Sequence, residues 1–222
     1  MAEVQRPSVF PALSEAEPAR SLPWLWPAVA LLFLTTTGLL AFMLWTQRWP
    51  AEGSPEVTFS RDMAAHHQQA VEMAFILRER SADEELRRFA LDILLTQQAQ
   101  IGQMQGWLAA WGLPLSGPQP VMGGQAEMMG MASREQVNEL QTLPVAEAEV
   151  AFLQLMIRHH QGGVMMAQEA LRQTNRPEVV RLATAIVNGQ QSEISYMEDL
   201  LKQRDAAPPE PLEMKDMDHG GS

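Results

Sequence analysis

Residues 56–108 of the chain recur 93 positions later without a gap, and this internal repeat limits the possible folds more than any other feature of the sequence. Identical residues stand at the corresponding positions Phe59 and Phe152, Met63 and Met156, His66-His67-Gln68 and His159-His160-Gln161, Met73-Ala74 and Met166-Ala167, Gln97-Gln98 and Gln190-Gln191, Ile101 and Ile194, and Met104 and Met197. Self-similarity at a fixed distance indicates that one supersecondary unit is used twice.

Each repeat is predicted to form a pair of helices, because its core-type residues alternate at spacings of four and three. In the first repeat one seam contains Phe59, Met63, His66, Ala70, Met73 and Leu77, and the other contains Leu86, Ala90, Ile93, Gln97, Gln100, Met104, Trp107 and Trp111. Heptad seams of this kind are typical of antiparallel bundle helices. Between them, Ser81-Ala82-Asp83-Glu84 has the form of a capping box that would begin the second helix.

The expected fold is therefore all-α: an antiparallel four-helix bundle over residues 56–204, built from two duplicated hairpins and preceded by one transmembrane helix. The two hairpins cover residues 56–112 and 145–204. The long helices are expected at about 57–80, 83–112, 145–173 and 176–204, with a short helix after Ser133.

An uncharged stretch from Trp24 to Trp45 precedes the repeats. About 20 apolar residues suffice to span a bilayer, and Trp at both ends suits the two interfaces. The apolar core of a cleavable signal peptide is shorter, about 7–15 residues, so we interpret this stretch as an uncleaved, single-pass anchor, with a cleaved signal as the alternative. The other segments are a disordered tail at 1–23, a linker at 46–55, and a flexible tail at 205–222 that contains Met214, Met217 and His219.

The composition excludes several kinds of function. The chain has no cysteine, which excludes disulfides, thiolate metal sites and cysteine nucleophiles. Its net charge of −11 and its only two lysines, Lys202 and Lys215, argue against nucleic acid as a partner. No nucleophile–base pair, phosphate-binding loop or carboxylate dyad has supporting context, so we predict that the protein is not an enzyme. The sequence identifies no protein partner.

Polar residues occupy seam positions that would ordinarily be aliphatic. An unpaired buried polar group costs roughly 1–3 kcal/mol, so these residues should meet one another or a ligand. If the first turn centres near Ala82, antiparallel pairing sets His66 level with Gln97 and Met63 with Gln100, and in the second hairpin His159 level with Gln190 and Met156 with Glu193. All of these residues then fall in one narrow layer flanked by methionines.

Neutral imidazole together with thioether sulfur suits a soft or borderline ion, copper(I) above all, with silver(I) similar. Imidazole alone would admit zinc or copper(II). Calcium and magnesium prefer oxygen ligands, and a di-iron site needs Glu-x-x-His on two helices. No Glu-x-x-His occurs in the chain, which disfavours oxidase or iron-storage chemistry. The layer therefore predicts binding of a metal ion, with copper(I) first.

The segments Phe59–Ala74, FSRDMAAHHQQAVEMA, and Phe152–Ala167, FLQLMIRHHQGGVMMA, resemble the DUF305 family. This resemblance covers about residues 56–204. It implies a ferritin-like four-helix bundle in a bacterial exported or membrane-anchored protein, facing the periplasm or the outer cell surface, in a family whose better-known members bind copper. The family's motif positions are matched by Met63, His66, His67, Met73, Met156, His159, His160 and Met166, and its partner-helix motif by Gln190, Glu193, Ile194 and Met197.

With the seam methionine Met104 and its counterpart Met197, these histidines and methionines are the candidate metal ligands. Gln97, Gln100, Gln190 and Glu193 are the residues expected to orient them by hydrogen bonds. Gln100 stands where the second hairpin has Glu193, so the resemblance implies unequal affinities in the two halves. It also implies a motif acid at Glu56 and at Glu149, three residues before each motif phenylalanine.

Two other interpretations remain open. The histidines could form a satisfied polar network that only fixes helix register, in a structural or partner-binding bundle without metal. The seam methionines could simply fill the core. The methionines of the loop, Met122, Met128, Met129 and Met131, are expected to be exposed and without a packing role, which favours a weak copper(I) capture site there and in the C-terminal tail.

Overall fold

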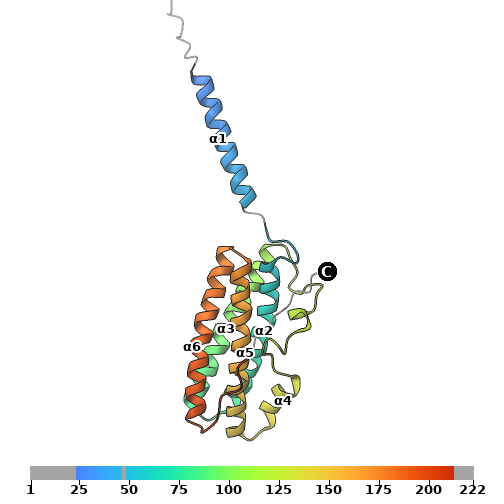
Figure 1. Cartoon of the computed structure of the whole chain (residues 1–222), viewed down its shortest axis with the longest axis vertical. Coiled ribbons are helices and arrows are strands. Elements are labelled where there is room, and N and C mark those ends of the chain that lie inside the picture. The colour runs from blue at the N-terminus through green and yellow to red at the C-terminus, as the bar shows by residue number, and fades with distance from the viewer. Residues whose placement is uncertain (1–23, 47–48, 213–222) are drawn as a thin grey trace, which may run out of the picture. The chain divides into compact units, whose positions relative to one another are not determined.

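The computed structural model describes residues 24–46 and 49–212, and every regular element within these ranges is a helix (Figure 1). The all-α prediction is thereby confirmed. The predicted tail at 1–23 and the Met214, Met217 and His219 cluster lie outside the described residues. Helix α1, Leu25–Thr46, belongs to a unit separate from the residues that follow Arg48.

Helix α1 carries no charged residue along its length. Residues Leu25–Leu44 have a mean hydropathy of 2.0 over 20 residues, and none of that stretch is buried against other parts of the chain. The hydroxyls of Thr35 and Thr36 both donate to the carbonyl oxygen of Leu32 at 2.9 Å, so these polar groups are satisfied within the helix itself. By length and composition α1 can cross a membrane, a property that it shares with signal sequences.

Four long helices lie side by side in the remaining unit (Figure 1). They are α2, Pro55–Arg80, α3, Glu84–Ala110, α5, Val145–Gln173, and α6, Pro177–Lys202. Helix α2 packs along α3 and α5 along α6, and the two hairpins meet chiefly through α2 and α5. The ends of all four helices fall within two residues of the predicted ends.

The beginning of α3 differs in detail from the prediction. Asp83 is the N-cap, and its carboxylate accepts from the backbone N–H groups of Glu85 and Leu86 at 2.9 and 3.2 Å. Ser81 instead ends α2, and its hydroxyl donates to a carboxylate oxygen of Glu149 at 2.6 Å. The predicted capping box is therefore wrong, because the serine is engaged by the other hairpin and the aspartate takes over its role.

Each hairpin turn is bound by an acid from the other hairpin. The Ser81 hydroxyl donates to Glu149, and at the corresponding position of the other turn the Thr174 hydroxyl donates to Glu56. These two acids are the ones that the family resemblance implied. Their structural role is to connect the start of one hairpin to the turn of the other.

The core consists of two apolar clusters with a polar layer between them. One cluster contains Ala70 to Leu77 of α2 together with the C-terminal turns of α6, and the other contains Val57 to Met63 of α2 with the first half of α6. Between them every long helix contributes buried polar side chains, namely His66, His67, Gln97, His159, His160 and Gln190. The polar layer thus crosses the middle of the bundle.

The inter-hairpin linker, residues 111–144, lies against α2 and α5. It contains a short 3-10 helix, η1, Val121–Gly124, and α4, Arg134–Thr142, the helix expected after Ser133. Helix α4 contacts both α2 and α5, and η1 contacts α2. A Cβ added at Gly162 would lie 1.7 Å from the carbonyl oxygen of Met129, so the linker backbone can approach α5 only because this residue has no side chain.

Candidate metal centre

The four histidines of the two repeats lie together in the middle of the bundle, and all are completely buried. The rings of His66 on α2 and His159 on α5 face each other, with centroids 3.7 Å apart and planes tilted by 30°. His67 and His160 lie on either side, each 6.3 Å from the ring that precedes it in the chain. The sequence therefore predicted correctly that these imidazoles share one buried layer.

Every one of the four Nε2 atoms has a hydrogen-bond partner that can act as an acceptor. His66 donates to the carbonyl oxygen of Met129 and His159 to that of His66, both at 2.9 Å. His67 donates to the side-chain oxygen of Gln100 at 2.7 Å, and His160 to a carboxylate oxygen of Glu193 at 2.6 Å. Because these oxygens accept the bond, the proton of each neutral ring resides on Nε2.

The opposite nitrogen of each ring is different. Nδ1 of His66, His67, His159 and His160 is buried and has no hydrogen-bond partner among the described residues. With the proton on Nε2, each Nδ1 carries a free lone pair. Metal-binding histidines commonly show this arrangement, in which the second nitrogen donates to a carbonyl or carboxylate and fixes the ring.

Burial keeps the rings of His66, His67 and His159 neutral. Loss of solvation lowers the pKa of His66 to about 4 and the pKa of His67 to about 3, and it lowers the pKa of His159 well below its ordinary value. For His67 and His159 the nearby His66 lowers the pKa further, because two imidazolium charges in one dry layer would repel. At neutral pH the lone pairs of these three rings are available to a ligand.

The two halves of the layer differ at one position. His67 meets the neutral amide of Gln100, whereas His160 meets the carboxylate of Glu193, whose side chain is one quarter exposed. A carboxylate that accepts from a ligating histidine makes the ring more basic than an amide does. The sequence difference between Gln100 and Glu193 thus becomes a difference in the acceptor for the second histidine of each pair.

The candidate methionines fall into two sets, one on each side of the polar layer. Met63, Met104 and Met166 belong to one apolar cluster, and Met73, Met156 and Met197 to the other. Each set combines residues of both hairpins. All of these methionines except the half-buried Met166 have no exposed surface.

The pairing of levels did not predict which residues form hydrogen bonds. Gln100 accepts from His67, and Glu193 accepts from His160. The reason is direction: consecutive residues are 100° apart around a helix, so the first histidine of each pair faces the other hairpin while the second faces its own partner helix. Gln97 and Gln190 are buried, and their amides have no hydrogen-bond partner among the described residues.

Within the described ranges, no group of three or more His, Asp and Glu side chains is placed so that it could hold a metal ion. A shared site in this layer would therefore need thioether sulfur as well as imidazole nitrogen. This requirement fits the methionines that border the layer on both sides, and it matches a soft ion better than a hard one.

Two features around the connection between the hairpins were not predicted from the sequence. The carbonyl of Met129 is the acceptor for His66, and Met165 lines a pocket near the linker. Met122 was expected to be exposed, but only 6% of its surface is accessible, and Met129 and Met131 are half-buried. Met128, with 51% exposed, is the member of this group that behaves as expected. The Gly162-Gly163 pair, present only in the second repeat, was the one local signal of a close backbone approach.

Comparison with known proteins is informative at the level of family and fold. The family model described as a domain of unknown function, DUF305, matches residues 56–201. A DUF305 protein from Streptomyces coelicolor is 46% identical, with a TM-score of 0.67, over 70% of this chain and 97% of that one. A DUF305 fragment from Deinococcus radiodurans is also 46% identical, with a TM-score of 0.63, over 69% of this chain and 99% of that one.

A third similar structure is CopM in its Cu(I)-bound form. It is 28% identical, with a TM-score of 0.56, over 67% of this chain and 96% of that chain. CopM has also been solved in Cu(II)-bound and Ag-bound forms. A search of curated proteins gives no match.

Proposed function

The chain belongs to the DUF305 family, and on that premise we propose that its bundle binds copper, chiefly as Cu(I), through the imidazoles and thioethers of the buried layer. The observation that carries the proposal is the set of four buried Nδ1 atoms without partners, on rings whose Nε2 atoms are all engaged. Leaving a polar atom buried and unpaired is unfavourable, and bound metal would give these atoms a partner.

The donor set favours Cu(I) over other ions. Neutral imidazole and thioether are soft to borderline ligands that carry no charge, so they suit a univalent soft cation. Binding of Cu(I), Cu(II) and silver by CopM supports this choice at the level of the family. The residues proposed to hold copper are the four layer histidines, at most two of them on any one ion, with sulfur from Met63 and Met104 on one side and from Met73, Met156 and Met197 on the other.

We further propose a binding role rather than catalysis, in which the bundle sequesters copper or passes it to another protein. Helix α1 would anchor it as a single-pass membrane protein, with the bundle in the periplasm or at the outer cell surface. This location is supported by the apolar character of α1. The copper would be cargo of the bundle.

The direct test is a Cu(I) titration of the full chain in detergent, under anaerobic reducing conditions, in competition with a chromogenic Cu(I) chelator. The variant that replaces His66, His67, His159 and His160 by Ala should lose the tight equivalents. Gln68→Ala, at an exposed position next to His67, is the matched control and should bind as the parent does. Equal binding by the histidine variant and the parent would overturn the proposal.

A second candidate function is favoured by the contact between His66 and His159. Their rings stack closely and their Nε2 atoms are satisfied, so the layer could serve only to fix helix register in a structural or partner-binding bundle. In that case His66→Leu with His159→Leu should be neutral or stabilising, because removal of both sides of a polar contact can cost little. Added copper should then leave the Tm of the parent unchanged, whereas a ligand at 100 times its Kd stabilises by about 2.7 kcal/mol.

A further inference from the structure

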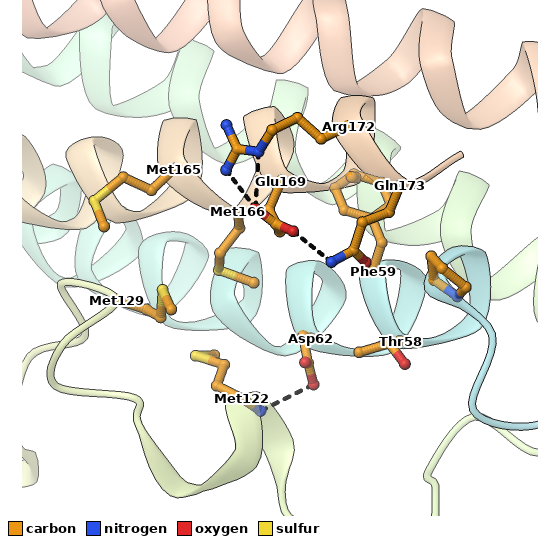
Figure 2. A pocket seen from close by; sticks show the side chains of 12 residues that line it. Thr58, Phe59, Asp62, Met122, Met129, Met165, Met166, Glu169, Arg172 and Gln173 are labelled. Carbon is orange, nitrogen blue, oxygen red and sulfur yellow. Dashed lines mark hydrogen bonds and ion pairs between the residues drawn. The ribbon is translucent and has the colours of Figure 1, made fainter. Parts of the chain in front are cut away.

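A second concentration of methionine sulfur lies outside the histidine layer, where the linker packs on α2 and α5. A pocket of about 250 Å³ is lined there by Met122, Met129, Met165 and Met166, with the carboxyl-bearing side chains of Asp62 and Glu169 (Figure 2). The rim includes exposed residues of α2 and α5, so the pocket reaches the surface. Four methionines on three separate segments are more than the filling of one surface pocket requires.

The thioethers converge on the pocket. Figure 2 shows the side chains of Met122, Met129 and Met166 directed toward one another, while Met165 lies farther along α5. Met122 comes from η1, Met129 from the loop that follows it, and Met166 from α5. Because no two of these three residues are neighbours in sequence, the tertiary packing of the linker brings the sulfurs together.

The backbone at Met122 is held in an unfavourable conformation. Its φ is +54°, in the left-handed region that L-residues with long side chains seldom adopt. Glycine, which adopts this region freely, stands at the next two positions but not at this one. The backbone N–H of Met122 donates to the carboxylate of Asp62 at 2.9 Å, which fixes the residue over the pocket. Met122 is the one methionine of η1, and this conformation turns its thioether toward the pocket (Figure 2). Backbone strain of this kind is concentrated at functional sites.

The pocket is charged in a way that suits a cation. The Asp62 carboxylate lines the pocket wall and accepts the Met122 N–H, and a cation bound beside it would favour its ionised form. Glu169 is paired with Arg172 and Gln173 at the rim, so its charge is already balanced (Figure 2). A thioether cluster beside one carboxylate favours a univalent soft cation over a divalent hard one, which would require several oxygens.

We propose that this pocket is a second site for a univalent soft cation, Cu(I) or Ag(I), held by the thioethers of Met122, Met129 and Met166. The site differs from the buried layer in its ligands, which are sulfur alone, and in its access to solvent. The two are adjacent, because Met129 places its sulfur in the pocket and its carbonyl on His66. An ion at the pocket would therefore lie next to the layer, as a first stop for incoming metal.

The test uses the full chain in detergent and Ag(I), which has the coordination preferences of Cu(I) and does not change oxidation state under these conditions. Met122→Leu with Met129→Leu removes two thioethers at nearly constant volume. Met128→Leu is the matched control, since Met128 is exposed in the same loop and does not line the pocket. Calorimetric titration gives the number and affinity of Ag(I) equivalents, and X-ray absorption gives the scatterers around the bound ion.

The pocket should contribute one Ag(I) equivalent with sulfur scatterers only to the parent and to Met128→Leu, in addition to any equivalents held by the histidine layer. The double variant should lose this equivalent or bind it at least about tenfold more weakly, the smallest loss expected when even an outer partner of a metal is removed. The same equivalent should persist in His67→Gln with His160→Gln, which alters the layer alone. Unchanged binding by the double variant, or disappearance of this equivalent in the histidine variant, would overturn the proposal. If the pocket binds Ag(I) but the histidine layer binds no metal, the function proposed for the layer is wrong and the proposal for the pocket is supported.

Discussion

His159 of one hairpin donates its Nε2 proton to the backbone carbonyl oxygen of His66 in the other at 2.9 Å, and the two rings stack with centroids 3.7 Å apart. The contact joins α2 and α5 at their crossing, where the hairpins meet. It also leaves the Nδ1 of both rings buried without a partner. The same contact thus joins the two hairpins and leaves the Nδ1 atoms of His66 and His159 available as ligands.

The free energy of unfolding should decrease as the pH falls below about 6.5. In the unfolded chain histidines have their ordinary pKa of about 6.5. Burial lowers the pKa of His66 to about 4 and that of His67 to about 3 in the folded chain. Between these values the unfolded state binds more protons, so stability is complete above pH 6.5 and is lost progressively toward pH 3, by up to roughly 1.4 kcal/mol per pH unit for each such histidine.

Denaturant unfolding at several pH values between 7.5 and 4 measures this slope. Carboxylates also contribute to acid destabilisation, so the decisive quantity is the difference from His66→Leu with His159→Leu. That variant lacks two of the buried rings and should have a shallower dependence of stability on pH. Identical slopes would show that the rings are protonated in the folded state.

Exchange of Gln100 and Glu193 should reverse the asymmetry of the layer. Glu193→Gln removes the carboxylate that accepts from His160, so the ring becomes less basic and Cu(I) affinity in that half should decrease about 10- to 100-fold. Gln100→Glu should raise the affinity in the other half for the same reason. Competition titrations with a Cu(I) chelator would detect both changes, and equal affinities in all variants would rule out any influence of these partners.

Gly162→Ala should detach the linker from α5. The new Cβ would lie 1.7 Å from the carbonyl oxygen of Met129, which must move and release its bond to His66. Overpacking of this kind typically costs about 1–3 kcal/mol. Gly189→Ala is a control on α6, where an added Cβ meets nothing within 4 Å, and this helical substitution should stabilise by up to about 1 kcal/mol.

Hydrogen exchange separates these effects. Amides of the segment 121–132 should exchange faster in Gly162→Ala and remain as protected as in the parent in Gly189→Ala. Equal protection of this segment in both variants would mean that the linker does not depend on the glycine.

Met63→Leu with Met156→Leu should reduce Cu(I) affinity while the fold persists. Both side chains are fully buried beside the histidine layer, and Leu nearly conserves their volume, so we expect a loss of stability below about 1.5 kcal/mol. The sulfur ligands are lost, however. Leu86→Met is the converse control, since it adds a thioether to a buried site remote from the layer. Unaltered copper binding by the double variant would assign these methionines to core filling alone.

The long helices could be predicted from the sequence because their signals are local. Heptad seams place the helix ends to within two residues of those observed, and Pro55 and Pro177 stand in the first turns of the observed helices. The burial of His66 and His159 also followed, because a seam position faces the interior in any antiparallel pairing.

The hydrogen-bond partners of the histidines could not be predicted in the same way. Level pairing gives the height of a residue along the bundle and ignores its direction around the helix, so it did not predict the hydrogen bond between His67 and Gln100. The acceptor for His66 comes from a loop 63 residues away in the chain, and neither spacing nor propensity indicates it. The inward turn of Met122 likewise depends on Asp62, a contact between segments 60 residues apart.

The bonds from Ser81 to Glu149 and from Thr174 to Glu56 have a consequence for the autonomy of the two hairpins. Each hairpin supplies the acid that binds the turn of the other. A deletion that leaves one hairpin alone would leave both an acid and a turn residue without their hydrogen-bond partners. A single hairpin is therefore expected to be less stable by itself than in the full bundle, although its helices are complete when read along the sequence.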